Sequence, residues 1–318
     1  MAQKATIVGI DIAKDKVDAC IRSASARQSF PSTAEGYQAL LDWLAGHGVG
    51  KAVMEASGGY ERNCAVALRA GAIEVRIVDP KRVRYFAKSA GRLAKNDPID
   101  AETIAWFGET FPQAPAKAGD DEREELDQLV SARLGLVRLK TQIANYGEHT
   151  QPPTVRKAHQ AVLKTLAVQL AKLEAAIATQ VKKSPRLTEP AAIIESVPGL
   201  AEGTAAGLIA FMPELGQVSN KVAAALLGVA PYDNDSGKHR GKRSIKGGRQ
   251  KARNLLYMPT MGAATQHNPV LKAHYQRLMA KGKEPKVALV AGMRKLIVIL
   301  NTMIARGETW DPTRHATA

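Results

Sequence analysis

The N-terminal part of the chain alternates between short apolar runs and segments with helical spacing, and this alternation constrains the fold more than any other feature. Residues 5–12 form an apolar run with the length of a buried strand, and residues 16–22 alternate like its hairpin neighbour. A polar segment at 27–30 follows as a third strand. We therefore expect the chain to begin with an α/β domain.

The next segments alternate regularly between the two patterns. Helical spacing covers 33–44 and 61–70, and strand-like runs cover 51–55 and 74–78. Three leading strands followed by alternating helix and strand indicate a ribonuclease-H-like layout, although periodicity does not fix the order of strands in the sheet.

The composition changes from residue 120 to about residue 183, where Leu, Ala, Lys, Gln and Glu dominate. Leucine and isoleucine then recur at steps of three and four residues, at Leu163, Leu166, Leu170, Leu173 and Ile177. That spacing predicts a coiled-coil-like seam, and Pro152 and Pro153 interrupt it. We expect two long helices packed as an antiparallel arm, which either closes on itself or pairs with a partner chain.

A third region begins near residue 193. Residues 196–200, Ser-Val-Pro-Gly-Leu, separate two helical patterns, which indicates a helix-hairpin-helix. In that motif the backbone N–H groups around Gly199 bind a DNA phosphate, whereas the alternative is an ordinary turn inside a helical bundle. The predicted fold class is α/β plus α, with domains at 1–115, 116–185 and 186–318.

The net charge of the chain indicates which kind of partner it binds. Its 45 Lys and Arg against 30 Asp and Glu give a formal charge of +15, which attracts polyanions and favours nucleic acid. The apolar runs are shorter than the roughly 20 residues that span a bilayer, and no secretory signal is evident. The only cysteines, Cys20 and Cys64, have no metal or redox spacing, so we expect a cytoplasmic, nucleoid-associated protein and no membrane partner.

Four acidic residues occupy the ends of predicted elements in the N-terminal domain. Asp11 lies near the end of the first strand, and Glu55 ends another strand just before a pair of glycines. Asp97 and Asp100 are three residues apart at a helix start, which places both on one face. Each acid also has a structural interpretation, as a turn residue, an ion-pair partner or a helix cap.

Gathering these acids requires a cation. Two like charges about 4 Å apart repel by about 1 kcal/mol in water and by about 4 kcal/mol at an effective dielectric of 20. Ligands that are all oxygen atoms favour Mg²⁺, or Mn²⁺ in vitro, over zinc. Ions held by such acids can neutralise the charge that develops during phosphoryl transfer.

The segments around these acids resemble one known family. They read Gly-Ile-Asp-Ile-Ala-Lys at 9–14, Glu-Ala-Ser-Gly-Gly-Tyr-Glu at 55–61 and Asp-Pro-Ile-Asp-Ala at 97–101. Together they resemble the DEDD transposases of insertion sequences related to the Piv and MooV invertases, over nearly the whole chain. The resemblance implies a RuvC-like domain whose metal tetrad is Asp11, Glu55, Asp97 and Asp100. It also implies a helical arm, a C-terminal transposase domain and guidance by a bridge RNA.

The same resemblance implies a serine nucleophile in the C-terminal domain. The family places a Ser-Gly pair after a Gly-x-Ala-Pro segment, and here Gly-Val-Ala-Pro at 228–231 precedes Ser236-Gly237. Without the family, Asn-Asp-Ser-Gly at 234–237 is ordinary turn chemistry, and Ser244 is a weaker second candidate. The chain departs from the family by placing acids just before Ser236 and by reading Ser-Ile-Lys-Gly-Gly at 244–248, so the phosphate contacts there stay open.

A basic run follows Ser236, and it contains no acid. We expect it to bind nucleic-acid phosphates, because guanidinium groups contact phosphate oxygens in pairs, while a solvated charged surface is the alternative. Its members are Lys238, Arg240, Lys242, Arg243, Lys246, Arg249, Lys251 and Arg253.

The sequence therefore predicts a DNA transposase or recombinase that acts through a metal-assisted phosphoserine. Its expected partners are donor and target DNA, a guide RNA and further copies of the chain, assembled from dimers into a tetramer as the resemblance implies. Three alternatives stay open. They are a structure-selective nuclease such as a Holliday-junction resolvase, an actin-like sugar kinase or ATPase, and a non-catalytic nucleic-acid-binding protein.

Overall fold

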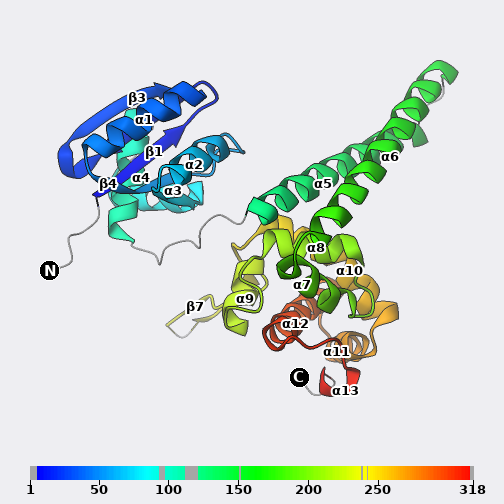
Figure 1. The fold of residues 1–318 in the computed structure, drawn as a ribbon. Helices are drawn as coiled ribbons and strands as arrows, with labels where there is room; N and C mark the ends of the chain where they lie inside the picture. Colours follow the sequence, from blue (N-terminus) through cyan, green and yellow to red (C-terminus); the bar gives the residue numbers. More distant parts are fainter. Residues whose placement is uncertain are drawn as a thin grey trace. The chain divides into compact units, whose positions relative to one another are not determined.

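The computed structural model divides the chain into two compact units, Met1–Gly119 and Asp120–Ala318 (Figure 1). It describes residues 6–92, 97–111, 121–149, 152–237, 239–241 and 243–315, and side chains are not described at 97–99, 121 and 315. The boundary between the two units lies near residue 119, and the three domains expected at 1–115, 116–185 and 186–318 stay predictions.

The first unit is an α/β domain, as the sequence indicated. In chain order its elements are β1 (Thr6–Ile12), β2 (Lys16–Ile21), η1 (Arg22–Ala24), β3 (Ala26–Pro31), α1 (Ala34–Gly46), β4 (Val49–Glu55), α2 (Glu61–Ala70), β5 (Glu74–Val78), α3 (Pro80–Ser89) and α4 (Asp97–Thr110).

The five strands form one mixed sheet in the order β3-β2-β1-β4-β5. β1, β2 and β3 form an antiparallel meander, and β4 and β5 run parallel to β1. This order brings β1 and β4 side by side at the centre, although α1 separates β4 from the meander in the chain. The carboxyl ends of the parallel strands therefore meet at one edge of the sheet.

Helices pack on both faces of this sheet. Val8 and Ile10 of β1 belong to a core cluster with residues of α1 and α2, on one face. Val53 of β4 belongs to a second cluster with Ile104 and Phe107 of α4, on the other. Because neighbouring residues of a strand point to opposite faces, each strand contributes to both cores.

The second unit is mostly helical. Its elements are α5 (Asp121–Glu148), α6 (Pro153–Lys182), α7 (Pro185–Glu195), α8 (Glu202–Phe211), α9 (Asn220–Leu227), β6 (Pro231–Tyr232), β7 (Asp235–Ser236), β8 (His239–Arg240), β9 (Ser244–Ile245), α10 (Gln250–Gly262), η2 (Ala263–His267), α11 (Pro269–Ala280), α12 (Pro285–Arg306) and α13 (Pro312–His315).

α5 and α6 are the two long helices expected from the leucine spacing, and they pack antiparallel (Figure 1). The start of α5 meets the end of α6, where Gln180 Nε2 donates to the Glu122 carbonyl at 2.8 Å. Farther along, Arg133 Nη2 lies 2.7 Å from Glu174 Oε1. The seam residue Leu170 is buried, as a leucine facing the neighbouring helix should be.

α12 is the central core helix of the second unit. Leu296, Ile297 and Leu300 are fully buried in the large helical core. Within the described part of the chain it is the one helix long and apolar enough to cross a membrane, and 56% of its apolar window is buried inside the unit. Arg294 and Lys295 divide this helix, so the sequence contains no uninterrupted apolar run of its full length.

Candidate active site

Asp11 and Glu55 lie at the same edge of the sheet. Asp11 is the penultimate residue of β1, and Glu55 is the last residue of β4. The parallel pairing ends with Ile10 beside Met54, so the next residues in register are the two acids. Adjacent strands lie about 4.8 Å apart, which brings the two backbones close enough for the carboxylates to share a ligand.

Both acids face the side of the sheet that α4 covers. A Cβ atom on Gly9 would lie 2.2 Å from the Ala101 carbonyl oxygen, so Gly9 faces α4 at close contact. Val53 also faces α4, because its Cγ2 would lie 2.7 Å from a Cβ on Gly108. Asp11 and Glu55 are two residues farther along these strands and therefore point to the same face.

α4 runs antiparallel to β1 and β4. Ala101, near its start, packs against Gly9, and Gly108, near its end, packs against Val53 and Ile7. The N-terminal end of α4 therefore lies at the edge that carries Asp11 and Glu55. This direction places the first turn of α4, with Asp100, beside those two acids, whereas the side chain of Asp97 lies outside the described residues.

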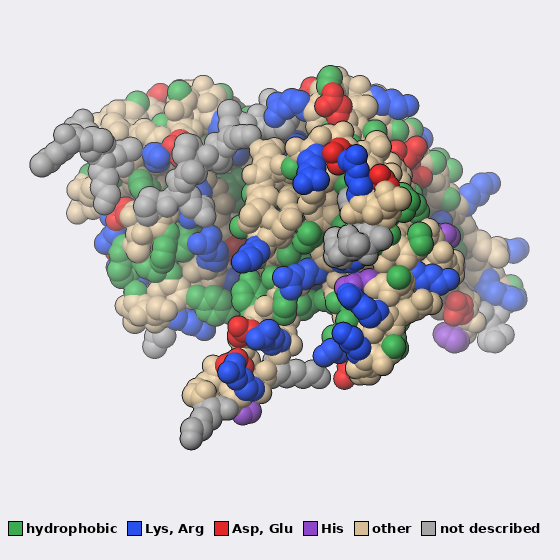
Figure 2. Space-filling model, turned by 90° about the horizontal axis from the view of Figure 1, so that it is seen from below, with side chains coloured by type: hydrophobic (Ala, Val, Ile, Leu, Met, Phe, Trp, Pro, Cys, Tyr) green, Lys and Arg blue, Asp and Glu red, His purple; other side chains and the backbone are tan. Residues whose placement is uncertain are grey.

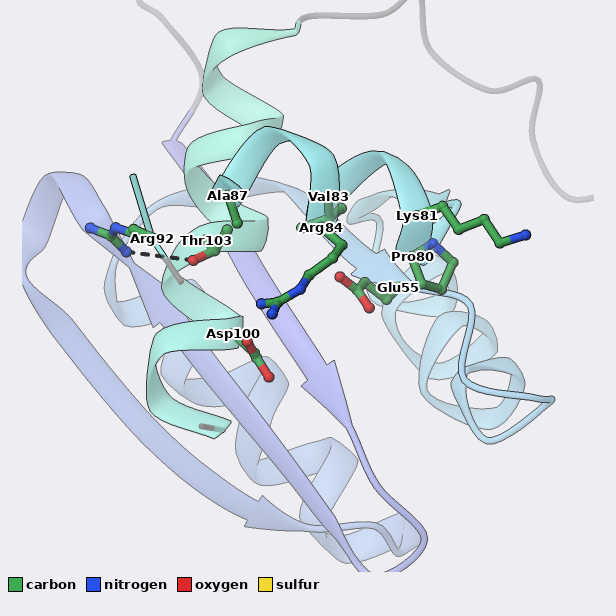
Figure 3. Close-up of a pocket in the computed structure, with 9 residues that line it drawn as sticks. All are labelled: Glu55, Pro80, Lys81, Val83, Arg84, Ala87, Arg92, Asp100 and Thr103. Carbon is green, nitrogen blue, oxygen red and sulfur yellow. Dashed lines mark hydrogen bonds between the residues drawn. The ribbon is translucent and has the colours of Figure 1, made fainter. Parts of the chain in front are cut away.

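A pocket of about 300 Å³ opens at this edge. Figure 3 shows Glu55 and Asp100 on its wall, together with Lys81, Arg84 and Arg92. The pocket therefore brings two of the four predicted acids together from β4 and α4. Asp11 lies on the same face and at the same edge but is not part of the pocket wall.

The donors at this edge fit a divalent ion of the magnesium type, since every one is a carboxylate oxygen. Among the side chains that the structure describes, however, no group of three or more His, Cys, Asp or Glu is gathered closely enough to hold a metal. The tetrad of Asp11, Glu55, Asp97 and Asp100 thus stays a prediction. Its described members share a sheet face and an edge.

Asp18 is a further acid on this face, which the sequence reasoning did not single out. It lies directly opposite Asp11 across the β1–β2 hairpin, and opposed residues of an antiparallel pair share a face. Asp18 is 9% exposed, pairs with Lys16 Nζ at 2.8 Å and accepts a hydrogen bond from Ser29. These partners give its carboxylate a structural role. The sequence carried a signal for it, since Asp18 is the one acid of β2 and lies between the apolar residues Val17 and Ala19.

Glu61 holds the glycine turn that follows Glu55. Its carboxylate accepts hydrogen bonds from the backbone N–H groups of Ser57 and Gly59, both at 2.9 Å. Gly59 has a φ of +112°, which favours glycine, so the turn depends on this residue type. Glu61 is 8% exposed and its contacts are internal, so it fixes the backbone next to Glu55.

Arg92 and Glu102 form a second contact that sequence reasoning missed. Arg92 Nη2 lies 2.6 Å from Glu102 Oε1, and Arg27 contacts the other oxygen of the same carboxylate. The hydrogen bond from Arg92 lowers the pKa of Glu102 against the opposing effect of burial. This ion pair links the segment before α4 to the helix itself, so it supports the position of Asp100.

Ser236 lies on a small hairpin of the second unit. β7 pairs antiparallel with β8, so Ser236 lies opposite His239, and Gly237 in the turn has a φ of +56°. Ser236 is thus the last residue of a short strand rather than part of a turn over 234–237, and it is exposed. Ser244 is exposed on a different short strand, β9, which pairs with β6.

The acids before Ser236 are paired with arginines of the basic run. Asp235 Oδ2 lies 3.2 Å from Arg240 Nη1, and Asp233 Oδ1 lies 2.7 Å from Arg243 Nε. Asp235 also accepts a hydrogen bond from the backbone N–H of Gly241 at 3.2 Å. The departure from the family sequence therefore has a structural explanation, because these acids brace the loop that carries Ser236.

Three members of the basic run contact other residues of the second unit. Arg249 makes two hydrogen bonds of 2.6 Å to Glu214, and Arg253 donates to the carbonyl groups of Gly228 and Gly247. Lys251 donates to Ser131 Oγ at 3.1 Å. These three side chains have structural partners inside the unit, which leaves their role in nucleic-acid binding a prediction.

The exposed members of the run are Arg240, Arg243, Lys246 and Lys251, while Lys238 and Lys242 lie outside the described residues. Lys and Arg side chains are spread over the face shown in Figure 2, with Asp and Glu fewer among them. Exposed Lys and Arg side chains favour contact with a polyanion.

Gly199 lies in the turn between α7 and α8. Its φ is +95°, and a Cβ there would lie 2.9 Å from the Cβ of Ala263. The turn therefore needs glycine for its conformation and for close packing. Helices α7 and α8 flank this turn, while a helix-hairpin-helix and a phosphate contact by its backbone stay predictions.

Comparisons with known proteins agree with this geometry. Residues 8–150 match the DEDD transposase family of IS110, described as "Transposase", and residues 191–276 match the "Transposase IS116/IS110/IS902 family". Two relatives, each named "Pilin gene-inverting protein", come from Moraxella bovis and Moraxella lacunata. Each is 26% identical and aligns over 98% of this chain and 99% of the relative.

The α/β unit with its acidic edge, followed by a basic helical unit, defines a transposase or recombinase, an enzyme that breaks and joins DNA. The chain belongs to the IS110 family of DEDD transposases. The resemblance seen in the sequence is therefore confirmed.

Proposed function

We propose that this protein is an RNA-guided DNA recombinase that cleaves and rejoins strands through a phosphoserine at Ser236. One observation carries the metal half of the proposal. Asp11 and Glu55 end adjacent parallel strands on the face where α4 places the turn containing Asp100. The strand order β3-β2-β1-β4-β5 supports a ribonuclease-H-like, RuvC-like assignment for this unit.

The acids and Ser236 have separate tasks in this proposal. Asp11, Glu55, Asp97 and Asp100 would hold a divalent ion, Mg²⁺ or Mn²⁺, which neutralises negative charge on a phosphate. Ser236 Oγ attacks the phosphorus, so an O–P bond to serine forms and the bond to the leaving strand breaks. The leaving oxygen takes a proton, which balances the proton lost by serine. A hydroxyl of the incoming strand then reverses these steps, so no ATP is consumed.

The second unit would bind the nucleic acids. Arg240, on the Ser236 hairpin, and Arg243 and Lys246, which follow it in the chain, are exposed and would contact phosphates. The backbone of the α7–α8 turn would add a contact that does not depend on sequence. Target choice would come from base pairing with a bridge RNA, and assembly from dimers to a tetramer would bring together units of different chains. Sequencing the RNA that copurifies with the protein tests whether it binds a guide RNA.

A cleavage assay with matched acid variants tests the metal half. Asp11→Asn should abolish Mg²⁺-dependent DNA cleavage, with a loss of at least about a hundredfold, because it removes a charge from the proposed ligand set. Asp18→Asn is the control. It alters the carboxylate directly opposite Asp11, keeps an oxygen to accept from Ser29 and should cleave at nearly the parental rate. Equal activity of the two variants would reject Asp11 as a ligand.

A further inference from the structure

The pocket at the acidic edge contains more positive than negative charge. Its wall has two carboxylates, Glu55 and Asp100, but three cationic side chains, Lys81, Arg84 and Arg92. Arg92 is held by Glu102 at 2.6 Å. In Figure 3 the ammonium group of Lys81 points away from the two carboxylates. Arg84 is therefore the cation to consider inside the pocket.

Figure 3 shows the guanidinium group of Arg84 directed into the space where the carboxylates of Glu55 and Asp100 lie. Arg84 comes from α3, whose next residue toward the N-terminus, Val83, is 3% exposed and anchored in the core with Ile104. The backbone of Arg84 is thus fixed, whereas its long side chain retains rotatable bonds.

The position of this guanidinium has an electrostatic reason. Two carboxylates at one edge repel each other, and a guanidinium directed toward both reduces that repulsion. A bound divalent ion would be the alternative cation for the same carboxylates. Two cations that depend on the same charges compete, so occupancy by one weakens binding of the other.

We infer that Arg84 is a displaceable counter-ion of the acidic pocket, which gives up Glu55 and Asp100 to a divalent ion and then binds a DNA phosphate. This inference rests on the proposed metal site. A guanidinium released from carboxylates can bind two phosphate oxygens, because its paired N–H groups fit both anions. Arg84 would thereby couple metal binding to DNA binding.

Arg84→Ala gives a test with two readouts of opposite sign, neither of which is activity. Removing the competing cation should tighten Mn²⁺ binding to the full-length protein, measured by calorimetry without DNA, by about fivefold or more. The same variant should bind a DNA duplex in Ca²⁺ more weakly, with a salt dependence reduced by about one phosphate contact.

Two further variants make the result specific. Arg84→Lys keeps the charge and should keep Mn²⁺ affinity close to the parental value. Lys88→Ala removes a charge from an exposed position one turn later on α3, outside the pocket, and should leave Mn²⁺ affinity almost unchanged. If the alanine variant misfolds, Arg84→Gln provides a second test. It removes the charge but keeps most of the side-chain volume, so it should also bind Mn²⁺ more tightly than the parental protein.

The outcomes separate the two proposals. Mn²⁺ binding that is lost in Asp11→Asn but unchanged or weaker in Arg84→Ala and Arg84→Gln would overturn the role of Arg84 alone. If no variant and no parental protein binds Mn²⁺, both the metal site and the counter-ion fail. Tighter Mn²⁺ binding together with undiminished DNA affinity would overturn the transfer of Arg84 to phosphate.

Discussion

Side chains of one type have different tasks in this chain, and their partners determine which. Arg249 makes two hydrogen bonds to Glu214 and one to the Phe211 carbonyl, whereas Arg240 is far more exposed and pairs with Asp235 of its own hairpin. Burial raises the pKa of Glu214 and is the largest single effect, but the hydrogen bonds and charge of Arg249, a backbone hydrogen bond and the charge of Arg123 together leave the pKa below its ordinary value of 4.5. The spacing of the basic run could not reveal this, because Glu214 lies 35 residues away.

Arg249→Ala and Arg240→Ala should therefore have separate effects. Loss of the paired hydrogen bonds should lower the free energy of unfolding by about 1–2 kcal/mol in Arg249→Ala, a value kept low because the pair is partly exposed. Arg240→Ala should change it by less than about 0.5 kcal/mol but weaken DNA binding. Denaturant unfolding and DNA titration check both. An equal loss of stability in both variants would contradict the separate roles of Arg249 and Arg240 within the basic run.

The pH dependence of stability provides a control. Because the pKa of Glu214 is lowered in the folded protein, its stabilising effect is present above the ordinary value of 4.5 and is lost as the pH falls through the lower folded value. Arg249→Ala should reduce this loss below pH 4.5, so the parental protein and the variant should converge in acid. A difference in the free energy of unfolding that stayed constant with pH would contradict the role of the Glu214–Arg249 pair.

Among the elements, strands were predicted from the sequence more completely than helices. β1, β2, β4 and β5 lie within a few residues of the expected segments, because each combines an apolar run with a polar boundary. α3 was not anticipated, since only Val83 and Ala87 are buried in an otherwise polar sequence. The order of strands, which places Asp11 beside Glu55, arises from pairing between distant segments and could not be read from periodicity.

The packing of α4 on the sheet should depend on Gly9. A Cβ there would lie 2.2 Å from the backbone of both Ala101 and Ala105, so Gly9→Ala must displace the helix that carries Asp100. We expect the unfolding transition of the first unit to lose about 1–3 kcal/mol and DNA cleavage to fall with it. Denaturant unfolding and a cleavage assay measure the two effects.

Gly50→Ala is the matched control, because Gly50 also lies in a strand and a Cβ there would meet nothing within 4 Å. It should change stability by less than about 0.5 kcal/mol and retain cleavage. If Gly9→Ala were as stable and active as Gly50→Ala, close packing of α4 would not position the acids.

At the scale of the whole molecule, the proposed chemistry is divided between two units. The acids belong to Met1–Gly119, and Ser236 belongs to Asp120–Ala318. The sequence indicated this division through the change in composition and through the family resemblance. Which units act together in an assembly depends on contacts between chains, and one amino-acid sequence does not specify those contacts.

The measurement that tests the central claim most directly is the identification of the residue that becomes linked to DNA. The protein would be incubated with Mg²⁺ and a nicked recombination substrate, denatured and digested, and the DNA-linked peptide sequenced by mass spectrometry. We predict a phosphodiester at Ser236, absent in Ser236→Ala and in Asp11→Asn but retained in Ser244→Ala. Cleavage without any covalent adduct would instead indicate a hydrolytic nuclease, and an adduct at another residue would contradict the assignment of Ser236.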